Sequence, residues 1–204
     1  MKQRNLVVIS AGLSQPSSTR LLADQLSAAA GRAAAQLGVT LDVQVIELRD
    51  LAHEITDHML TGFPAAALKQ AQESVAAADG LIVVTPVFSA SYSGLFKSFF
   101  DVLEQDTLTD KPVLLAATAG TARHSLVLEH ALRPLFAYLR AVPLPTAVFA
   151  ASDDWGANSV EGPLRGRIER AAGELARELE RRVPATVADP FALTESFEDM
   201  LKSL

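Results

Sequence analysis

Short apolar segments alternate with longer amphipathic segments along most of the chain. The short segments are rich in β-branched and aliphatic residues and predict strands at residues 6–10, 41–48, 81–85, 113–118 and 146–150. The longer segments repeat apolar residues at helical spacing and predict helices at residues 17–37, 64–78, 95–103, 125–139 and 162–182. Because parallel strands need helical crossovers that cover both faces of the sheet, this alternation predicts a three-layer α/β sandwich.

The second predicted strand is the most polar. Asp42, Gln44 and Glu47 interrupt its apolar positions, which favours a place at the edge of the sheet. A five-stranded parallel sheet in the order 2-1-3-4-5 satisfies this. In such a sheet the ligand binds at the carboxyl ends of the strands, near the switch point between the first and third strands.

The junction after the third predicted strand carries the most information. Residues 79–85 form a continuous apolar run typical of a strand covered on both faces, and we expect Pro86 to end it. The following loop offers the hydrogen-bonding side chains Ser89, Ser91, Tyr92 and Ser93. A polar but uncharged loop suits a neutral, planar ligand, although a plain strand-to-helix connection would have a similar composition.

The loop after the first strand contains neither GxGxxG nor GxxxxGK, so the usual dinucleotide and triphosphate loops are absent. It carries hydroxyl residues before a helix N-terminus, namely Ser10, Ser14, Ser17, Ser18 and Thr19, followed by Arg20. Hydroxyls and free amides at this position predict a site for a single phosphate. A second interpretation stays open, in which a serine caps the helix and Arg20 pairs with Asp24.

A third loop, residues 118–124, follows the fourth strand and again consists mainly of small residues. Gly120 would permit close approach of the backbone to a ligand. His124 could face a ring system, or it could be a capping or solvent-facing group. In the predicted strand order the three loops share one edge of the sheet, where together they outline a phosphate pocket beside a flat slot.

Composition narrows the function classes. The net charge of −6 argues against nucleic-acid binding. The absence of cysteine excludes disulfides, thiolate metal sites and cysteine nucleophiles. Neither a signal sequence nor an apolar run of about 20 residues is found, and we expect a cytoplasmic protein. The four histidines lack metal-site spacing and no catalytic triad is evident, so no metal is expected.

Two parts are predicted, a single domain at residues 1–183 and a C-terminal docking tail at residues 184–204. The tail places Phe197, Met200, Leu201 and Leu204 at helical spacing. Because it is too short to bury this stripe by itself, it must dock on another surface. We expect truncation after Pro184 to weaken assembly or partner docking more than the fold.

Between residues 5 and 182 the chain resembles the flavodoxin-like NAD(P)H-dependent FMN reductases, especially those paired with luciferase-like flavin monooxygenases. The resemblance is carried by SAGLSQPSSTR at 10–20, by ADGLIVVTPVFSASYSGLFK at 78–97, and by TAGTARHS at 118–125 with ALRP at 131–134. Family members often have a tyrosine where His130 stands, in a helix near a subunit interface.

The resemblance implies a role for each loop. Residues 10–20, including Ser10, Ser14, Ser17, Ser18, Thr19 and Arg20, would hold the FMN phosphate. The isoalloxazine ring would be bordered by Pro86, Val87, Phe88, Ser89, Ser91 and Tyr92. Its other side would be closed by Ala119, Gly120, Thr121 and His124.

The expected activity is hydride transfer from NAD(P)H to FMN, with reduced flavin supplied to a monooxygenase by a homodimer or homotetramer. Stacked rings matter more for this reaction than an acid or a base, because the cofactor supplies the chemistry. Two alternatives stay open. One is an FMN-containing quinone, azo or metal-oxyanion reductase, and the other is a flavodoxin-like electron carrier without nicotinamide activity.

Overall fold

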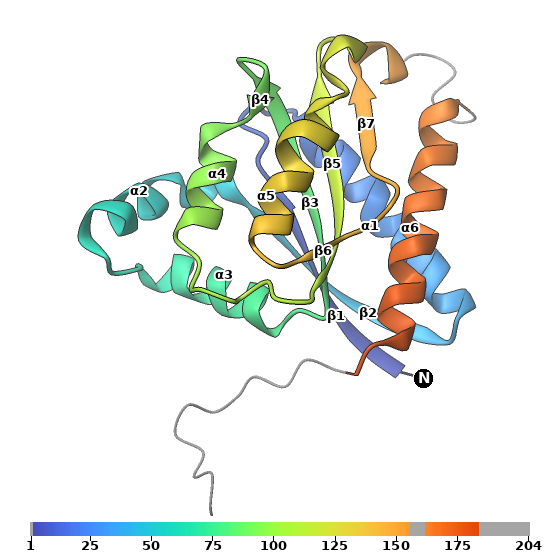
Figure 1. Cartoon of the computed structure of the whole chain (residues 1–204), viewed down its shortest axis with the longest axis horizontal. Helices are drawn as coiled ribbons and strands as arrows, with labels where there is room; N and C mark the ends of the chain where they lie inside the picture. Colours follow the sequence, from blue (N-terminus) through green and yellow to red (C-terminus); the bar gives the residue numbers. More distant parts are fainter. Residues whose placement is uncertain (1, 156–161, 184–204) are drawn as a thin grey trace, which may run out of the picture.

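A mostly parallel sheet forms the centre of the computed structural model, which describes residues 2–155 and 162–183 (Figure 1). Neighbouring strands in the sheet follow the order β2-β1-β3-β5-β6. In addition, β7 pairs with β5, and β4 pairs with β3. The strands are β1 (Lys2–Ser10), β2 (Val39–Glu47), β3 (Gly80–Phe88), β4 (Ser91–Tyr92), β5 (Pro112–Ala119), β6 (Val142–Pro143) and β7 (Val148–Ala151). The predicted order 2-1-3-4-5 is confirmed, with the fifth place shared by β6 and β7.

Helices cover both faces of the sheet, as the alternating pattern predicted. The helices are α1 (Ser18–Gln36), α2 (Ala52–Thr61), α3 (Ala66–Ala77), α4 (Gly94–Asp101), α5 (Arg133–Tyr138) and α6 (Pro163–Arg181). Helices α1 and α6 pack together on one face, while α3, α4 and α5 lie on the other (Figure 1). The three-layer α/β sandwich is therefore confirmed.

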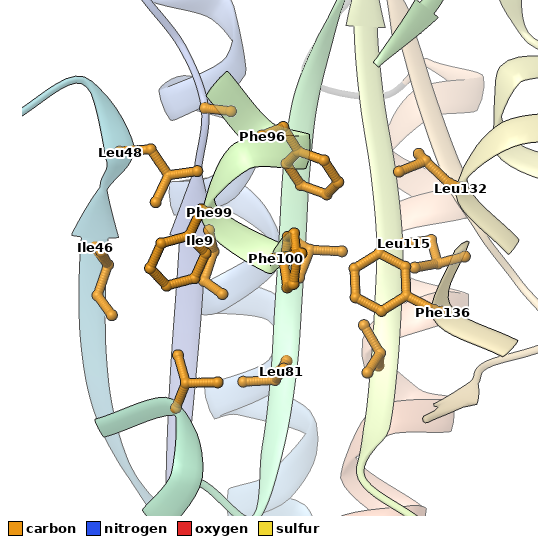
Figure 2. Close-up of a cluster of buried hydrophobic side chains, with 14 of the residues drawn as sticks. Ile9, Ile46, Leu48, Leu81, Phe96, Phe99, Phe100, Leu115, Leu132 and Phe136 are labelled. Carbon is orange, nitrogen blue, oxygen red and sulfur yellow. The ribbon is translucent and has the colours of Figure 1, made fainter. Parts of the chain in front are cut away.

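The core on the α4 side is aromatic. Phe96, Phe99 and Phe100 are at most 2% exposed, and Phe100 meets Phe136 of α5 edge-on with ring centroids 4.9 Å apart. Figure 2 shows these rings over Ile9, Leu81 and Leu115 of the sheet. The three phenylalanines of α4 are thus buried by packing within the chain. On the opposite face, aliphatic residues of α1 and α6 form a separate core against the sheet.

The polar second strand lies at the edge of the sheet, as predicted. Strand β2 pairs with β1 in parallel register from Lys2↔Val39 to Ser10↔Glu47, and most of its residues are exposed or only partly buried. An edge strand with one partner can expose polar side chains to water, which is why the sequence of β2 alternates.

The prediction that Pro86 ends the third strand is wrong. Strand β3 continues to Phe88, with Pro86 opposite Thr118 in the parallel register with β5. The carbonyl of Val84 accepts from Ala11, so the main-chain groups of Val84 face β1. The direction of the main-chain groups repeats every two residues along a strand, so those of Pro86 face the same side as those of Val84. At the level of Pro86, β1 has already ended, so no strand there needs an N–H from this residue. No ladder hydrogen bond is lost there.

The predicted helix at 125–139 is also wrong in part. The segment forms a 3₁₀ turn at Ala122–His124, a π-helix at Leu128–Leu132 and only then α5. Pro134 lacks an N–H and cannot donate to the carbonyl four residues earlier, so a regular α-helical ladder cannot run through the whole segment. Its place in the first turn of α5 is tolerated.

Two further departures concern short elements. The helix α2 and the 3₁₀ turn before it, Leu48–Leu51, were not predicted. Only Ile55 of α2 is fully buried, so its apolar periodicity was too weak to reveal it. The predicted strand 146–150 corresponds to β7, and the short strand β6 that precedes it was not predicted.

Two findings concern the membrane and the tail. No helix of residues 2–155 and 162–183 is long and apolar enough to cross a membrane. The predicted docking tail, residues 184–204, lies outside the described residues.

Candidate functional site

Three loops emerge side by side from the carboxyl ends of neighbouring strands. They follow β1, β3 and β5, which are adjacent in the sheet. Strand β1 ends at Ser10 beside Val84, and β3 and β5 continue a few residues further in register, with Pro86 opposite Thr118. The structure thus brings together the segments that carry all the predicted site residues, at the edge where open α/β sheets bind ligands.

The first loop begins with a buried hydroxyl. Ser10 is 0% exposed, and its Oγ has no hydrogen-bond partner among the residues that the structure describes. A buried polar atom without a partner costs about 1–3 kcal/mol. An unpaired hydroxyl at the carboxyl end of a strand therefore indicates that a polar group of a ligand is expected to bind there.

Gly12 allows the first loop to curl tightly. A Cβ at this position would lie 2.1 Å from the Oγ of Ser17, well inside contact distance. The loop therefore folds back onto the start of α1, while Ser14 and Ser18 remain exposed. The main chain is anchored to the sheet where the N–H of Ala11 donates to the carbonyl of Val84 over 2.9 Å.

The N-terminus of α1 closes the first loop. Ser17 is the N-cap, and its Oγ accepts from the N–H of Arg20 over 3.2 Å. By helix geometry the amides of Ser18 and Thr19 have no intrahelical acceptor. The first turn contains no acidic residue, so the helix dipole and these amides favour an anion here.

Arg20 is already paired within the protein. Its Nε donates to Asp24 over 2.8 Å, and its Nη1 contacts Glu47 at the end of β2. The hydrogen bond to Asp24 is the main cause that raises the pKa of Arg20, with smaller contributions from both carboxylates against the cost of burial. The capping and pairing interactions of the second interpretation are therefore present. They leave the amides at the helix end free for an anion.

A pair of buried threonines joins the start of α1 to the end of β5. The hydroxyls of Thr19 and Thr118 lie 2.8 Å apart, and both residues are at most 3% exposed. Thr118 was not among the predicted site residues. Its polarity at the end of an otherwise apolar strand was a usable signal, because a buried hydroxyl requires a partner.

The second loop is a tight β-hairpin. Val87 and Phe88 pair with Tyr92 and Ser91 in antiparallel register. The turn residues Ser89 and Ala90 both have positive φ, 48° and 69°, which is the combination of a type I′ turn. The hairpin projects beyond the sheet (Figure 1) and leaves Phe88 about half exposed, at 48%.

The base of the hairpin is held by buried hydroxyls. Thr85 Oγ1 accepts from the N–H of Ser93 over 3.1 Å. Ser93 in turn caps α4, because its Oγ accepts from the N–H of Phe96 over 3.2 Å. Sequence reasoning identified Ser93 as a loop residue but not as a helix cap. The half-buried Ser91 and Tyr92 are thereby positioned at the edge of the sheet.

The third loop offers an open backbone. Ala119 and Thr121 are half-buried, Gly120 is exposed, and no heavy atom lies within 4 Å of a Cβ placed on Gly120. Thr121 caps the following 3₁₀ turn. His124 is exposed in that turn, which agrees with a solvent-facing residue and leaves it accessible to a ligand.

A family model matches residues 4–156, and it is described as NADPH-dependent FMN reductase. An FMN reductase (NADPH) of Pseudomonas aeruginosa is 40% identical over 168 residues, covering 82% of this chain and 88% of the relative. An NADH-dependent FMN reductase, SfnE, of Pseudomonas putida is 39% identical and covers 88% of this chain and 91% of its own.

Solved structures agree with this relationship. An oxidoreductase of Corynebacterium diphtheriae superposes with a TM-score of 0.84 at 50% identity, over 90% of this chain and all of that one. The apo form of an NADH:FMN oxidoreductase, EmoB, superposes with a TM-score of 0.76 at 28% identity, over 92% of each chain. With the family model covering most of its length and close relatives matching nearly throughout, this chain belongs to the NADPH-dependent FMN reductase family.

Proposed function

We propose that this protein is an NAD(P)H-dependent FMN reductase that transfers a hydride from the nicotinamide to FMN and supplies reduced flavin to a monooxygenase. The observation that carries the proposal is the buried, unpaired Ser10 hydroxyl beside the N-terminus of α1. Family membership supports the same reaction. The sulfur of cysteine plays no part in it, since the chain has none.

The residues of the first loop fit the phosphate end of FMN. The Ser10 hydroxyl, the amides of Ser18 and Thr19 and the side chains of Ser14 and Ser17 supply hydrogen-bond donors to an anion. Arg20 contributes positive charge near the helix end, with its guanidinium oriented by Asp24 and Glu47. A Cβ at Gly12 would collide with the Ser17 hydroxyl, so only glycine lets the loop bring Ser17 this close.

The other two loops fit a flat ring. The hairpin residues Pro86, Val87, Phe88, Ser89, Ser91 and Tyr92 would border one side of it. The third loop would close the opposite side with Ala119, Gly120, Thr121 and His124. The exposed Gly120, with no atom near its missing side chain, leaves backbone amides available to donate to the ring.

When bound, FMN supplies the hydride-accepting chemistry. The protein's part is to hold the two rings in contact and to exclude water from between them. Backbone amides near Gly120 would donate hydrogen bonds where negative charge develops on the reduced ring. No side chain needs to act as a general acid or base in this scheme. The residues that matter are therefore those that position the rings.

The partner, the assembly and the location are further parts of the proposal. The relatives that support the reductase assignment include NADH-dependent FMN reductases named SfnE and SfnF, and we propose a flavin-dependent monooxygenase as the recipient of reduced flavin. We also propose a homodimer or homotetramer. A location in the cytoplasm is favoured by the availability of both nicotinamide nucleotides there.

The deciding experiment measures oxidation of NADH and NADPH with and without added free FMN. Acceleration by added FMN supports the proposed reaction. Turnover that requires a quinone, an azo compound or a metal oxyanion would indicate a reductase with permanently bound FMN. If neither nicotinamide is oxidised under any of these conditions, the protein is an electron carrier or a flavin-binding module, and the proposal fails.

The phosphate site is tested by the substitution Ser10→Ala. Loss of one hydrogen bond to a charged group is expected to raise the dissociation constant of FMN about tenfold. The matched control is Ser74→Ala on α3, where the hydroxyl bonds only to the carbonyl of Gln70 on the exposed surface. Titration of flavin fluorescence measures both. Equal affinity in the two variants would remove Ser10 from the site.

A further inference from the structure

One arginine at the edge that carries the three loops takes no part in the site described above. Arg49 lies in the 3₁₀ turn Leu48–Leu51, directly after β2. The last residue of β2, Glu47, pairs with Ser10 at the end of β1, so this turn lies beside the first loop. The Arg49 side chain is only 28% exposed, and it is therefore mostly covered although arginine is always charged.

Arg49 holds the middle of the first loop. Its Nη1 donates to the carbonyl of Leu13 over 3.2 Å. The two ends of the loop are anchored separately, through Ala11 to β3 and through the cap Ser17 to α1. Within the described part of the chain, residues 12–16 form no other hydrogen bond. Arg49 therefore decides the position of the loop between its two anchors.

The hydrogen bond from Arg49 also fixes the direction of the next amide. The carbonyl of Leu13 and the N–H of Ser14 belong to one planar trans peptide unit, in which they point in opposite directions. The N–H of Ser14 has no acceptor among residues 2–155 and 162–183. With Arg49 bound to the carbonyl, this N–H is directed away from the guanidinium, whose charge also polarises the peptide unit. The Ser14 amide is thereby held ready to donate to an anion in the loop.

Arg49 keeps more of its charge for an anion than Arg20 does. Arg20 contacts two carboxylates, those of Asp24 and Glu47. The one ion pair that Arg49 forms within the described chain is with Asp50, where the Nε–Oδ1 distance of 3.6 Å is too long for a hydrogen bond. The Asp50 side chain is 70% exposed, so water screens this pair. A charge in contact with the loop attracts an anion held by it, because such short separations lie within the Debye length of about 8 Å at physiological ionic strength.

We propose that Arg49 is a positioning residue that makes the site select the phosphorylated flavin, FMN, over riboflavin, which has the same ring and no phosphate. It acts through the Leu13 carbonyl, which holds the loop and orients the Ser14 amide toward the anion, and through its own charge. The proposal rests on the phosphate site of the proposed function. It adds the turn after β2, which lies outside the three loops, to the elements that recognise the flavin.

The variants Arg49→Met and Arg49→Lys test this role by flavin titration without nicotinamide. Methionine keeps an unbranched apolar side chain and removes the donors and the charge, whereas lysine retains a donor and the charge. The matched control is Arg32→Met, because Arg32 is an exposed residue of α1 paired with Glu169 and its substitution changes the net charge equally. Fluorescence titration gives the dissociation constants of FMN and of riboflavin for each protein.

The proposal expects Arg49→Met to raise the dissociation constant of FMN at least about tenfold and that of riboflavin less than about twofold, because only FMN carries the charged group. Arg49→Lys should recover most of the preference for FMN, and Arg32→Met should leave both constants unchanged. Equal weakening of the two flavins by Arg49→Met would overturn the proposal, because a merely structural role has that effect. An Arg49→Lys variant that binds FMN no better than Arg49→Met would also overturn it.

Steady-state oxidation of NAD(P)H gives a second measurement. With FMN as acceptor, Arg49→Met is expected to raise KM about tenfold at unchanged kcat, whereas with riboflavin neither constant should change. A lower kcat at unchanged KM would contradict the proposal. The titration needs no nicotinamide, so its outcome is independent of the reductase activity. A wild type that binds FMN and riboflavin equally would refute the phosphate site and this inference together, whereas a preference for FMN that persists in Arg49→Met would refute only the role of Arg49.

Discussion

At the scale of single residues, the first loop depends on one missing side chain. Gly12 is needed because the Ser17 hydroxyl occupies the space that a Cβ would take. Ser17 also caps α1, so the same atom forms the tight loop and satisfies the helix end. A small change at Gly12 is therefore transmitted to the proposed phosphate site.

The substitution Gly12→Ala is expected to displace Ser17 and remove the cap, which costs about 1 kcal/mol of unfolding free energy. FMN affinity should fall with it. The control is Gly31→Ala within α1, where nothing lies within 4 Å of the added Cβ. There we expect stabilisation of up to about 1 kcal/mol. Urea unfolding and flavin titration measure both effects, and an unchanged Gly12→Ala variant would refute the loop geometry described here.

Lys111 is a buried cation at the opposite end of the sheet. It is 5% exposed, and its Nζ donates to the carbonyls of Ala76 and Ala78 at the end of α3, each over 2.8 Å. Burial is the main cause that lowers the pKa of Lys111 from 10.5, and repulsion from Arg182 adds to it, while Asp79 acts in the opposite direction.

This lowered pKa predicts a pH dependence with a definite sign. Between the pKa of the folded state and 10.5, the unfolded chain binds more protons at this site than the folded one. The contribution of Lys111 to the unfolding free energy therefore rises as pH increases through this window. The unfolding free energy of the wild type minus that of Lys111→Met is expected to increase from neutral pH toward pH 10.5. A difference that falls over this range would contradict the expectation.

At the scale of elements, neighbouring strands deliver their loops to one edge, and side-chain hydroxyls join those loops. The Thr19–Thr118 hydrogen bond ties α1 to β5, which are far apart in sequence. The Thr85 and Ser93 contacts tie the hairpin to α4. The three loops are thus joined to the sheet and to the neighbouring helices by hydrogen bonds between side chains and main chain.

The threonine pair allows a double-mutant cycle. Thr118→Val leaves the buried Thr19 hydroxyl without its partner and is expected to cost about 1–3 kcal/mol of unfolding free energy. The double variant Thr19→Val with Thr118→Val should cost less than the sum of the single variants, because no orphan hydroxyl remains. Chemical denaturation of all four proteins gives the coupling energy. Strict additivity would mean that the hydroxyls do not interact.

At the scale of the whole molecule, hydrogen bonds connect the first strand, β1, to the C-terminal end of α6. Arg4 performs this closure by donating to the carbonyls of Leu179 and Arg182 at the C-terminal end of α6. The contact joins residues separated by most of the described chain.

The substitution Arg4→Met is expected to lower the unfolding free energy by about 2–3 kcal/mol, because buried carbonyls lose their donor. The control is Arg32→Met, since Arg32 forms an exposed ion pair with Glu169 over 2.7 Å. Exposed pairs contribute about 1 kcal/mol at most. Thermal and urea unfolding compare the two variants, and equal losses would show that the Arg4 contacts are not important for closure.

The sequence by itself determined the layers, the strand order and the edge position of β2. The spacing of apolar residues is a local property, and it shows directly which face of a strand or helix is buried. It also identified the three loops, since hydroxyl and glycine residues cluster visibly after each buried strand. Family membership agrees with the resemblance found in those same segments.

Tertiary structure alone decided the features that depend on partners distant in sequence. Pro86 continues β3 because β1 has already ended beside it, which no local pattern reveals. The division of the helix before α5 and the Thr19–Thr118 pair likewise depend on neighbours that only the fold supplies. The sequence gives the type of each residue, but the tertiary packing determines which group forms hydrogen bonds with it.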